Sequence, residues 1–385
     1  MRTRMSRLAL AAGAAAVSLM LVSAAPAGAA DKRPLSLGFA GSDTTYFMMK
    51  LIGSHYVASS SNTLHDKVTQ IPPLNKSPFP ASVTVPGDWE HGKKTWDSSN
   101  AQATPPNGSS AGIAALSADT NGFIDAARSS RGPNPGETNT MDFWAYALGA
   151  VDFVTFPGTN APAAGLTQQQ LINIYTCDPS TGAPFVSDWS QLPGGKPGAI
   201  VKYIPQAGSG TLTFFQTKLL NGATVDQNCD PLHQSIRLEE HDARGVSNGD
   251  KHNAIFAYDW ARWRAQKNGF EQNLTNGSVL GKFGVSTPVG PSASNVNETA
   301  NRFFGTRYVY NVVRKTNHPG QRGNELNDVT RLIGVRTTAQ GGAQYICSGK
   351  AKADITKAGF VPLLQKKTGG TGLPASFCRF NPTPL

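Results

Sequence analysis

Gly41-Ser42-Asp43-Thr44-Thr45 is the first of three short stretches with one design, in which an apolar strand leads into a small polar loop and then a helix start. The others are Gly108-Ser109-Ser110-Ala111-Gly112 and Gly208-Ser209-Gly210-Thr211. Glycine lets the backbone approach a ligand closely, hydroxyls donate hydrogen bonds, and the free N–H groups at a helix N-terminus favour an anion. One such loop is weak evidence, but three in similar contexts predict a cradle for an oxyanion.

Strand and helix patterns alternate around these loops. Apolar spacing predicts strands at 35–40, 199–204 and 254–258, and each is followed by a polar loop or a helical pattern. Residues 167–175 are predicted as a further helix, with Thr167 as its cap. This alternation is typical of α/β sheets, in which ligands lie beyond the carboxyl ends of the strands.

The length of the chain predicts two lobes, because 385 residues exceed what one core usually serves. We expect lobe 1 to comprise residues 30–155 plus 305–385, and lobe 2 to comprise residues 156–304. Two apolar strands, 144–156 and 308–313, are predicted to cross between the lobes and to act as the hinge.

One segment of lobe 1 stands out by composition. Residues 58–107 are rich in Ser, Pro, Asn and Lys, so they are predicted to be a long, mostly irregular insertion. Only 81–85 within it resembles a strand.

The N-terminus predicts export. Three arginines, Arg2, Arg4 and Arg7, precede an apolar run and an Ala-Gly-Ala cleavage site, so residues 1–29 are predicted to be a secretory signal peptide. The segment contains no cysteine for lipid attachment, and no stretch is long and apolar enough to span a bilayer. We therefore expect a secreted, extracellular or periplasmic protein, either soluble or held by a partner.

The charge of the chain suits an anionic partner. The formal charge is +10 and becomes +7 once the three arginines of the predicted signal peptide are removed. Lysine and arginine are spread along the chain without a basic run, so nucleic-acid binding is not predicted.

The four cysteines are predicted to form disulfide bonds, as is typical of an exported protein. Pairing Cys177 with Cys229 and Cys347 with Cys378 is the economical connectivity, and two other connectivities stay open. The chain has no C-x-x-C motif, and His241 and His252 are isolated, so neither a metal nor a cofactor is predicted.

Taken in order, these motifs resemble those of the phosphate-binding receptors of bacterial ABC importers, in the type II periplasmic-binding-protein group. The family's first loop reads G-x-G-x-T-F, its second G-S-S-G-G ahead of D-F-G-A-S-D, and its third R-x-D-G-S-G-T. Residues 41–46, 108–112 with 125–130, and 208–211 stand in these places, and 253–258 is similar to the family's G-A-I-G-Y strand. The resemblance implies a two-lobed α/β fold that closes by a hinge around phosphate or a related tetrahedral oxyanion, with an ABC permease as partner.

Two residues depart from the family pattern. The family's acidic acceptor, which takes a hydrogen bond from the ligand's own proton, falls on Ser130, and its binding arginine falls on Pro205. Losing the acid weakens discrimination between protonated phosphate and fully deprotonated sulfate. Arg128 and Arg131 flank the serines at this strand end, and we expect one of them to enter the site; the alternative is that both pair with acids on the surface.

Substitute proton acceptors are Asp43, Glu240 and Asp242, each of which could equally be a solvated loop acid or a helix cap. The resemblance implies contacts from the Thr45 hydroxyl, the Tyr46 backbone N–H, and the third loop. With the neighbouring loop residues, the full set of candidate ligand contacts is Thr44, Thr45, Tyr46, Ser109, Ser110, Arg128, Ser129, Ser130, Arg131, Ser209, Gly210 and Thr211.

The favoured function is therefore a monomeric solute-binding protein, with binding and closure but no chemistry. One alternative is a secreted protein of the same fold that binds an organic ligand or a surface. A secreted phosphatase or hydrolase with Ser209 as nucleophile is less favoured, because Ala207 replaces the first glycine of G-x-S-x-G and no histidine is an evident base.

Overall fold

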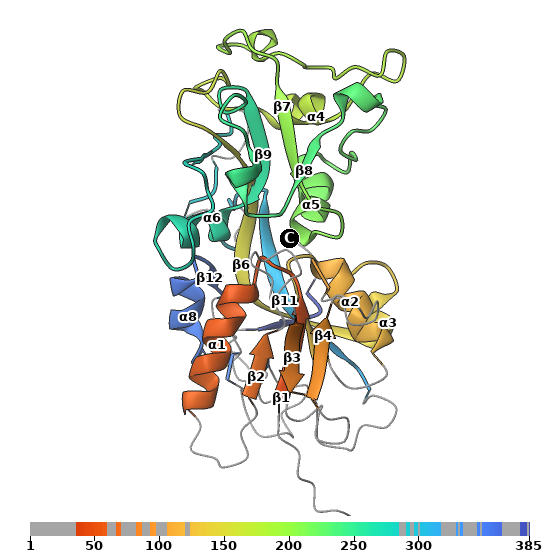
Figure 1. Ribbon diagram of the computed structural model, residues 1–385, viewed down its shortest axis with the longest axis vertical. Coiled ribbons are helices and arrows are strands. Elements are labelled where there is room, and N and C mark those ends of the chain that lie inside the picture. The colour runs from red at the N-terminus through yellow and green to blue at the C-terminus, as the bar shows by residue number, and fades with distance from the viewer. Residues whose placement is uncertain are drawn as a thin grey trace, which may run out of the picture. The chain divides into compact units, whose positions relative to one another are not determined.

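The computed structural model describes most of the chain after the predicted signal peptide (Figure 1). The described residues are 36–59, 67–70, 82–86, 93–97, 106–119, 124–284, 290–292, 296–298, 301–316, 329, 332–333, 345–346, 349–363, 378–382 and 385. The predicted signal peptide, residues 1–29, lies outside them.

A mixed sheet forms the centre of the fold, in the strand order β2-β1-β5-β11-β6-β9-β7-β8. Its strands are β1 (Ser36–Gly41), β2 (Lys67–Gln70), β5 (Ala126–Ser129), β6 (Met141–Thr155), β7 (Val201–Pro205), β8 (Ile236–Leu238), β9 (Ala254–Asp259) and β11 (Thr306–Arg314). Three short strands, β10 (Val279–Leu280), β12 (Val361–Pro362) and β13 (Arg379–Phe380), pair with β6. A separate hairpin joins β3 (Ser82–Pro86) and β4 (Lys93–Asp97).

Helices connect these strands. They are α1 (Tyr46–Ser59), α2 (Ser109–Ala118), α3 (Glu137–Thr140), α4 (Gln168–Tyr175), α5 (Gly210–Phe214), α6 (Trp260–Lys267) and α8 (Lys352–Lys357). Single helical turns occur at Trp189–Gln191, Pro231–His233 and Ala243–Gly245, and α5 continues as a π-helical turn over Phe215–Leu219. Thr167 caps α4 in a capping box with Gln170, which confirms the predicted start of this helix.

Strand β6 belongs to two sets of strands. Its first part, up to Ala150, pairs with β11, whereas Val151 to Val154 pair with β9 (Figure 1). The prediction of a long crossing strand at 144–156 is thus confirmed. The segment 308–313 is also a strand, and its pairings are with β5 and β6. The lobe boundaries given above stay a prediction.

The predicted insertion is more regular than its composition indicates. Residues 67–70 form β2, which pairs in parallel with β1 at the edge of the main sheet, and the strand expected at 81–85 is present as β3. The mostly irregular insertion at 58–107 stays a prediction as a whole, but β2 and β4 lie within this segment and were not predicted from its composition. A four-residue edge strand is too short for a composition average to reveal it.

The cysteine pairing is confirmed in part. Cys177 and Cys229 are joined by a disulfide, with their Cα atoms 4.9 Å apart. Cys378 is also disulfide-bonded, and Cys347, its predicted partner, lies outside the described residues.

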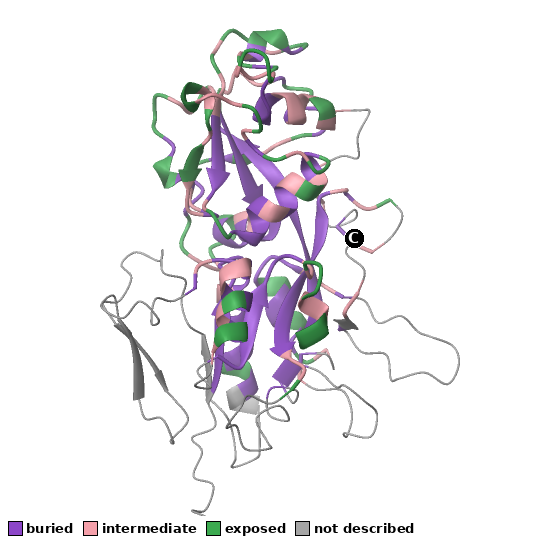
Figure 2. Ribbon diagram, turned by 90° about the vertical axis from the view of Figure 1, so that its right-hand side faces the viewer, coloured by how far each residue is buried: buried purple, intermediate pink, exposed green. Residues whose placement is uncertain are grey.

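The sheet carries the core. Every residue of β6 is buried, as are all six residues of β9, which explains why these strands read as continuous apolar runs (Figure 2). No helix in the described part of the chain is both long and apolar enough to cross a membrane.

Candidate functional site

The three polar loops meet at the carboxyl ends of the strands. The loop after β1 leads into α1, the loop after β7 leads into α5, and Asn107, just before α2, bridges to Gly41 at the end of β1. The approach is close: a Cβ atom added to Gly108 would overlap the carbonyl oxygen of Gly208. Glycine is required at this crossing for lack of space and because its φ of 98° is rarely adopted by other residues.

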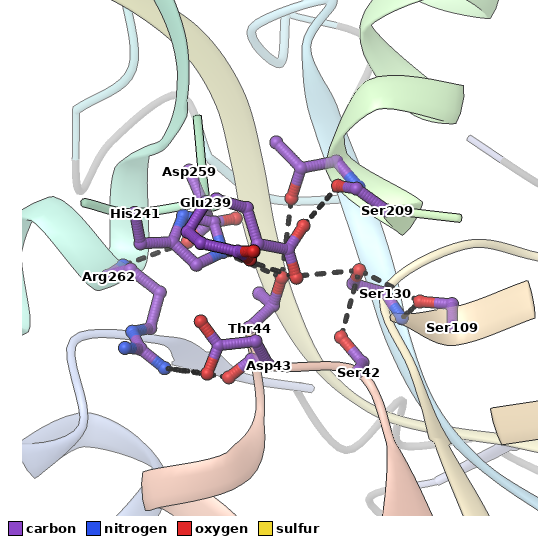
Figure 3. Close-up of polar contacts among 12 residues, drawn as sticks. Ser42, Asp43, Thr44, Ser109, Ser130, Ser209, Glu239, His241, Asp259 and Arg262 are labelled. Atoms are coloured by element: carbon purple, nitrogen blue, oxygen red, sulfur yellow. Dashed lines mark hydrogen bonds and ion pairs between the residues drawn. The ribbon is translucent and has the colours of Figure 1, made fainter. Parts of the chain in front are cut away.

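Hydroxyl groups from these loops and from Ser130, the residue after β5, form one buried group, which we call the hydroxyl cluster (Figure 3). Its members are Ser42, Thr44, Ser109, Ser130, Ser209 and Thr211, all at most 1% exposed. Ser130 lies at the centre of the cluster. Its Oγ atom is 3.2 Å from Ser42 Oγ, 3.3 Å from Thr44 Oγ1 and 3.2 Å from Ser109 Oγ. Thr44 extends the cluster to Thr211, with 3.3 Å between their Oγ1 atoms.

Ser209 and Gly210 shape the third loop. Ser209 caps α5 by accepting hydrogen bonds from the backbone N–H groups of Thr211 and Leu212, each at 3.1 Å. A Cβ at Gly210 would overlap the hydroxyl oxygen of Ser109 and crowd that of Ser130. The helix start thus packs directly against the serine hydroxyls.

Acidic side chains border the cluster on one side. Ser209 donates a short hydrogen bond to Glu240, and the Nε2 atom of His241 lies 3.0 Å from Thr44 Oγ1 and 3.8 Å from Glu240 Oε1. Asp43 is buried beside them. Each of Asp43, Glu240 and His241 offers a possible metal-ligand atom, and these three atoms lie within 4.8 Å of one another. Sequence spacing did not reveal this group, because Asp43 is almost 200 positions away from the other two.

The environment changes the acidity of Glu240. Burial raises the pKa of its carboxyl group to about 7, and the nearby Asp43 carboxylate acts in the same direction. The hydrogen bond from Ser209 and the charges of Arg307 and Arg262 oppose this shift.

Two buried arginines face the acids, and neither was among the candidates from the sequence. Arg307, on β11, donates through Nη2 to Asp259 Oδ2 at 2.7 Å and to Thr211 Oγ1 at 2.9 Å. Its Nε and Nη1 atoms are buried and make no hydrogen bond with any described residue. Arg262, on α6, donates to the Asp43 carbonyl oxygen at 2.7 Å and pairs with Glu271 at 2.6 Å. The sequence feature that could have identified Arg307 as a site residue was its position at the start of the apolar strand 306–314.

The structure brings together Thr44, Ser109, Ser130, Ser209, Gly210 and Thr211, as well as Asp43 and Glu240. Asp242 is placed elsewhere: it caps the turn Ala243–Gly245 and pairs with Arg244 at 2.6 Å. Proposing Asp242 as a proton acceptor of the site is therefore wrong.

Neither Arg128 nor Arg131 takes the place expected for a replacement arginine. Arg128 is fully buried, but it donates to the backbone carbonyl oxygens of Phe39, Gly41 and Ser42. Burial lowers its pKa to about 10. Arg131 forms a bidentate pair with Glu137, at 2.8 Å for each bond. Both guanidinium groups are used to hold the ends of the strands.

Four further candidates lie outside the hydrogen bonds of the cluster. Ser110 accepts from Arg131 Nε at 2.9 Å, and the Ser129 hydroxyl donates to the Arg131 carbonyl oxygen at 2.8 Å. The Tyr46 N–H donates to the Asp43 carbonyl oxygen at 3.0 Å as α1 begins, and Thr45 is buried in the same turn.

The mixed α/β sheet and the loops that meet beyond its strand ends have the two-lobed fold of type II periplasmic binding proteins. The sequence profile of the PBP superfamily domain matches residues 95–332, and the chain belongs to this family. A comparison with curated proteins finds no match.

One solved structure supports this fold, and a second is similar to the chain to a lesser degree. An ABC-type phosphate transport receptor from Vibrio cholerae is 15% identical and has a TM-score of 0.50, with 85% of this chain and 99% of that chain covered. A putative phosphate ABC transporter substrate-binding protein from Clostridium perfringens, solved with bound phosphate, is 14% identical with a TM-score of 0.49, over 86% of this chain and 100% of that chain. At such low identity, the likeness concerns the fold.

Proposed function

We propose that this chain is an exported solute-binding protein that binds phosphate or a related tetrahedral oxyanion at the hydroxyl cluster. The convergence of three loops on six buried hydroxyl groups carries the proposal. Hydroxyl groups are neutral donors that can replace part of the water shell of an anion. As in a receptor, binding and closure would be the whole mechanism.

Arg307 supports the proposal, since it takes the role of the arginine that the family carries at the position of Pro205. One of its nitrogens already binds Thr211, and two further donor atoms make no hydrogen bond with the described residues. A guanidinium fork matches two oxygens of a tetrahedral anion. Glu240 and Asp43 border the same cluster and can accept a proton carried by the ligand.

The partner and the location follow from the same proposal. A receptor of this kind would deliver its ligand to an ABC permease, and the N-terminal segment predicts export. We propose that the protein acts as a monomer outside the cytoplasm.

Thermal unfolding of the ligand-stripped protein with phosphate, arsenate, sulfate and molybdate tests the proposal. Binding at 100 times Kd adds about 2.7 kcal/mol to the free energy of unfolding. We expect Arg307→Gln to lose this stabilisation, and Arg244→Gln, a control on the surface, to keep it. No stabilisation by any of the four anions would refute the proposal.

A second variant tests whether the absence of the family's acidic residue at position 130 changes the choice of anion. Ser130→Asp restores the acidic acceptor of the family beside the hydroxyl cluster, so it should weaken sulfate binding more than phosphate binding. Unchanged binding of both anions would show that Ser130 does not face the ligand.

An organic ligand is the alternative if none of the four anions binds. A hydrolase is less well supported, because Ser209 contacts Glu240 and, among the described residues, no histidine contacts its hydroxyl.

A further inference from the structure

Two carboxylates and one imidazole lie close together in the interior of the site; they belong to Asp43, Glu240 and His241. All three side chains are fully buried, and Glu240 Oε1 makes no hydrogen bond with any described residue, although Oε2 of the same group accepts from Ser209. Carboxylate oxygen and imidazole nitrogen together are a donor set that suits Zn²⁺ and similar divalent ions.

The three ligand atoms lie close enough to be drawn onto one ion. Zinc bonds to such ligands are about 2.0–2.2 Å long, so two ligand atoms of one tetrahedral ion lie roughly 3.4 Å apart. Glu240 Oε1 and His241 Nε2 are 3.8 Å apart, and all three ligand atoms lie within 4.8 Å. Side-chain shifts of up to roughly 1.4 Å would therefore bring all three atoms into one coordination shell.

The local fold holds His241 in place. Its φ of 67° is rare for a residue other than glycine. Its carbonyl oxygen accepts hydrogen bonds from the Tyr258 hydroxyl and, at 2.8 Å, from Gln266 Nε2. A strained backbone held by two buried donors is typical of a position that orients a side chain for binding.

Charged groups surround these three side chains. Four buried acids and three buried guanidinium groups lie together; they are Asp43, Glu240, Asp259 and Glu271, with Arg128, Arg262 and Arg307. A divalent ion bound among the acids would add positive charge beside the hydroxyl cluster and would make that cluster more favourable for an anion.

We propose that Asp43, Glu240 and His241 bind a divalent metal ion of the Zn²⁺ class. The Thr44 hydroxyl oxygen lies 3.0 Å from His241 Nε2, so this oxygen or one from a bound anion could complete the coordination.

Isothermal titration of the EDTA-stripped, tag-free protein with zinc chloride tests this site without any oxyanion. We expect one ion per chain, and at least tenfold weaker binding in Glu240→Gln and in His241→Gln. His233→Gln is the matched control, because His233 pairs with Asp230 on the surface. Absence of zinc binding, or equal binding by the wild type and both site variants, would overturn the inference.

Zinc-edge anomalous diffraction of the wild-type protein keeps the test valid if a variant fails to fold. A peak between Glu240 and His241 is expected, and zinc at other positions only would contradict the site. Oxyanion titrations of the stripped and zinc-loaded forms then separate the two proposals. Anion binding without zinc binding would refute this inference alone, whereas zinc binding without any anion binding would refute only the proposed function.

Discussion

The two sides of the site are built in different ways. The neutral side consists of Ser42, Ser109 and Ser130, which stand in or beside glycine-rich loops and contact one another through hydroxyl groups. The charged side consists of Glu240, from the turn after β8, and of Asp259, Arg262 and Arg307, which come from β9, α6 and β11. The comparison shows that local loop chemistry supplies the neutral donors, whereas long-range packing assembles the charges.

The largest expected effect comes from breaking the charged side at Asp259. This carboxylate pairs with Arg307 at 2.7 Å and also caps α6 through the Arg262 N–H. Asp259→Ala should lower the free energy of unfolding by about 3–5 kcal/mol, because it leaves a buried guanidinium without its counter-charge. Urea denaturation measures the loss.

Asp259→Asn separates the two roles, because the amide oxygen can still cap the helix. We expect this variant to recover only the capping contribution, about 1 kcal/mol. A loss below about 1 kcal/mol for Asp259→Ala would show that the ion pair does not stabilise the fold.

Gly210→Ala is expected to have a smaller effect, on the neutral side. The added methyl group would overlap the Ser109 hydroxyl and crowd that of Ser130, so the free energy of unfolding should fall by about 1–2 kcal/mol. Gly249→Ala is the control, because its Cβ would lie 3.7 Å from the nearest atom, Ser247 Oγ. Equal unfolding midpoints for the two variants would contradict this tight packing.

The buried carboxyl group of Asp152 is expected to change how the free energy of unfolding depends on pH. This buried carboxyl group has an oxygen, Oδ2, without a hydrogen-bond partner among the described residues, in contrast to the paired Asp259. Burial raises its pKa well above the usual value, against the opposing hydrogen bond from the Phe153 N–H.

Because the folded pKa of Asp152 is raised, its contribution to stability is present below the unfolded pKa, about 3.9, and is lost as the pH rises toward the folded pKa. Asp152→Asn has no carboxyl group and does not lose stability in this way. The urea midpoint of the variant should therefore rise relative to that of the wild type as the pH rises from 4 to 8. Hydrogen bonds from Ser180 lower the pKa of Asp178, so its contribution to stability is lost as the pH falls below about 3.9, and Asp178→Asn should differ from the wild type in pH dependence only in that acidic range. Parallel pH profiles for the wild type and Asp152→Asn would contradict the assignment.

Most of the fold was predictable from the chain. The strands at β1, β6, β7 and β9 appear where apolar runs predict them, because a strand buried in a sheet must be apolar along its length. The edge strand β2 was not predictable, because its four residues carry too little pattern and its pairing with β1 is a long-range contact.

The candidate site divides in the same way. Hydroxyl groups such as those of Ser109 and Ser209 were found because loop, glycine and helix start are adjacent in the chain. Arg128 and Arg131 have the right chemistry beside the right loop, but backbone carbonyl oxygens and Glu137 take up their donors. Proximity in sequence does not decide where a long side chain points.

Residues close in the chain, or simple counting, were enough to predict the alternation of strands and helices, the three glycine-serine loops and the pairing of Cys177 with Cys229 as the economical choice. The folded chain was needed to see that Arg307 contacts Thr211 and that one buried group contains Asp43, Glu240 and His241. Charges at these separations meet only when the strands that carry them have found their neighbours, and burial then makes their pairing energetically decisive.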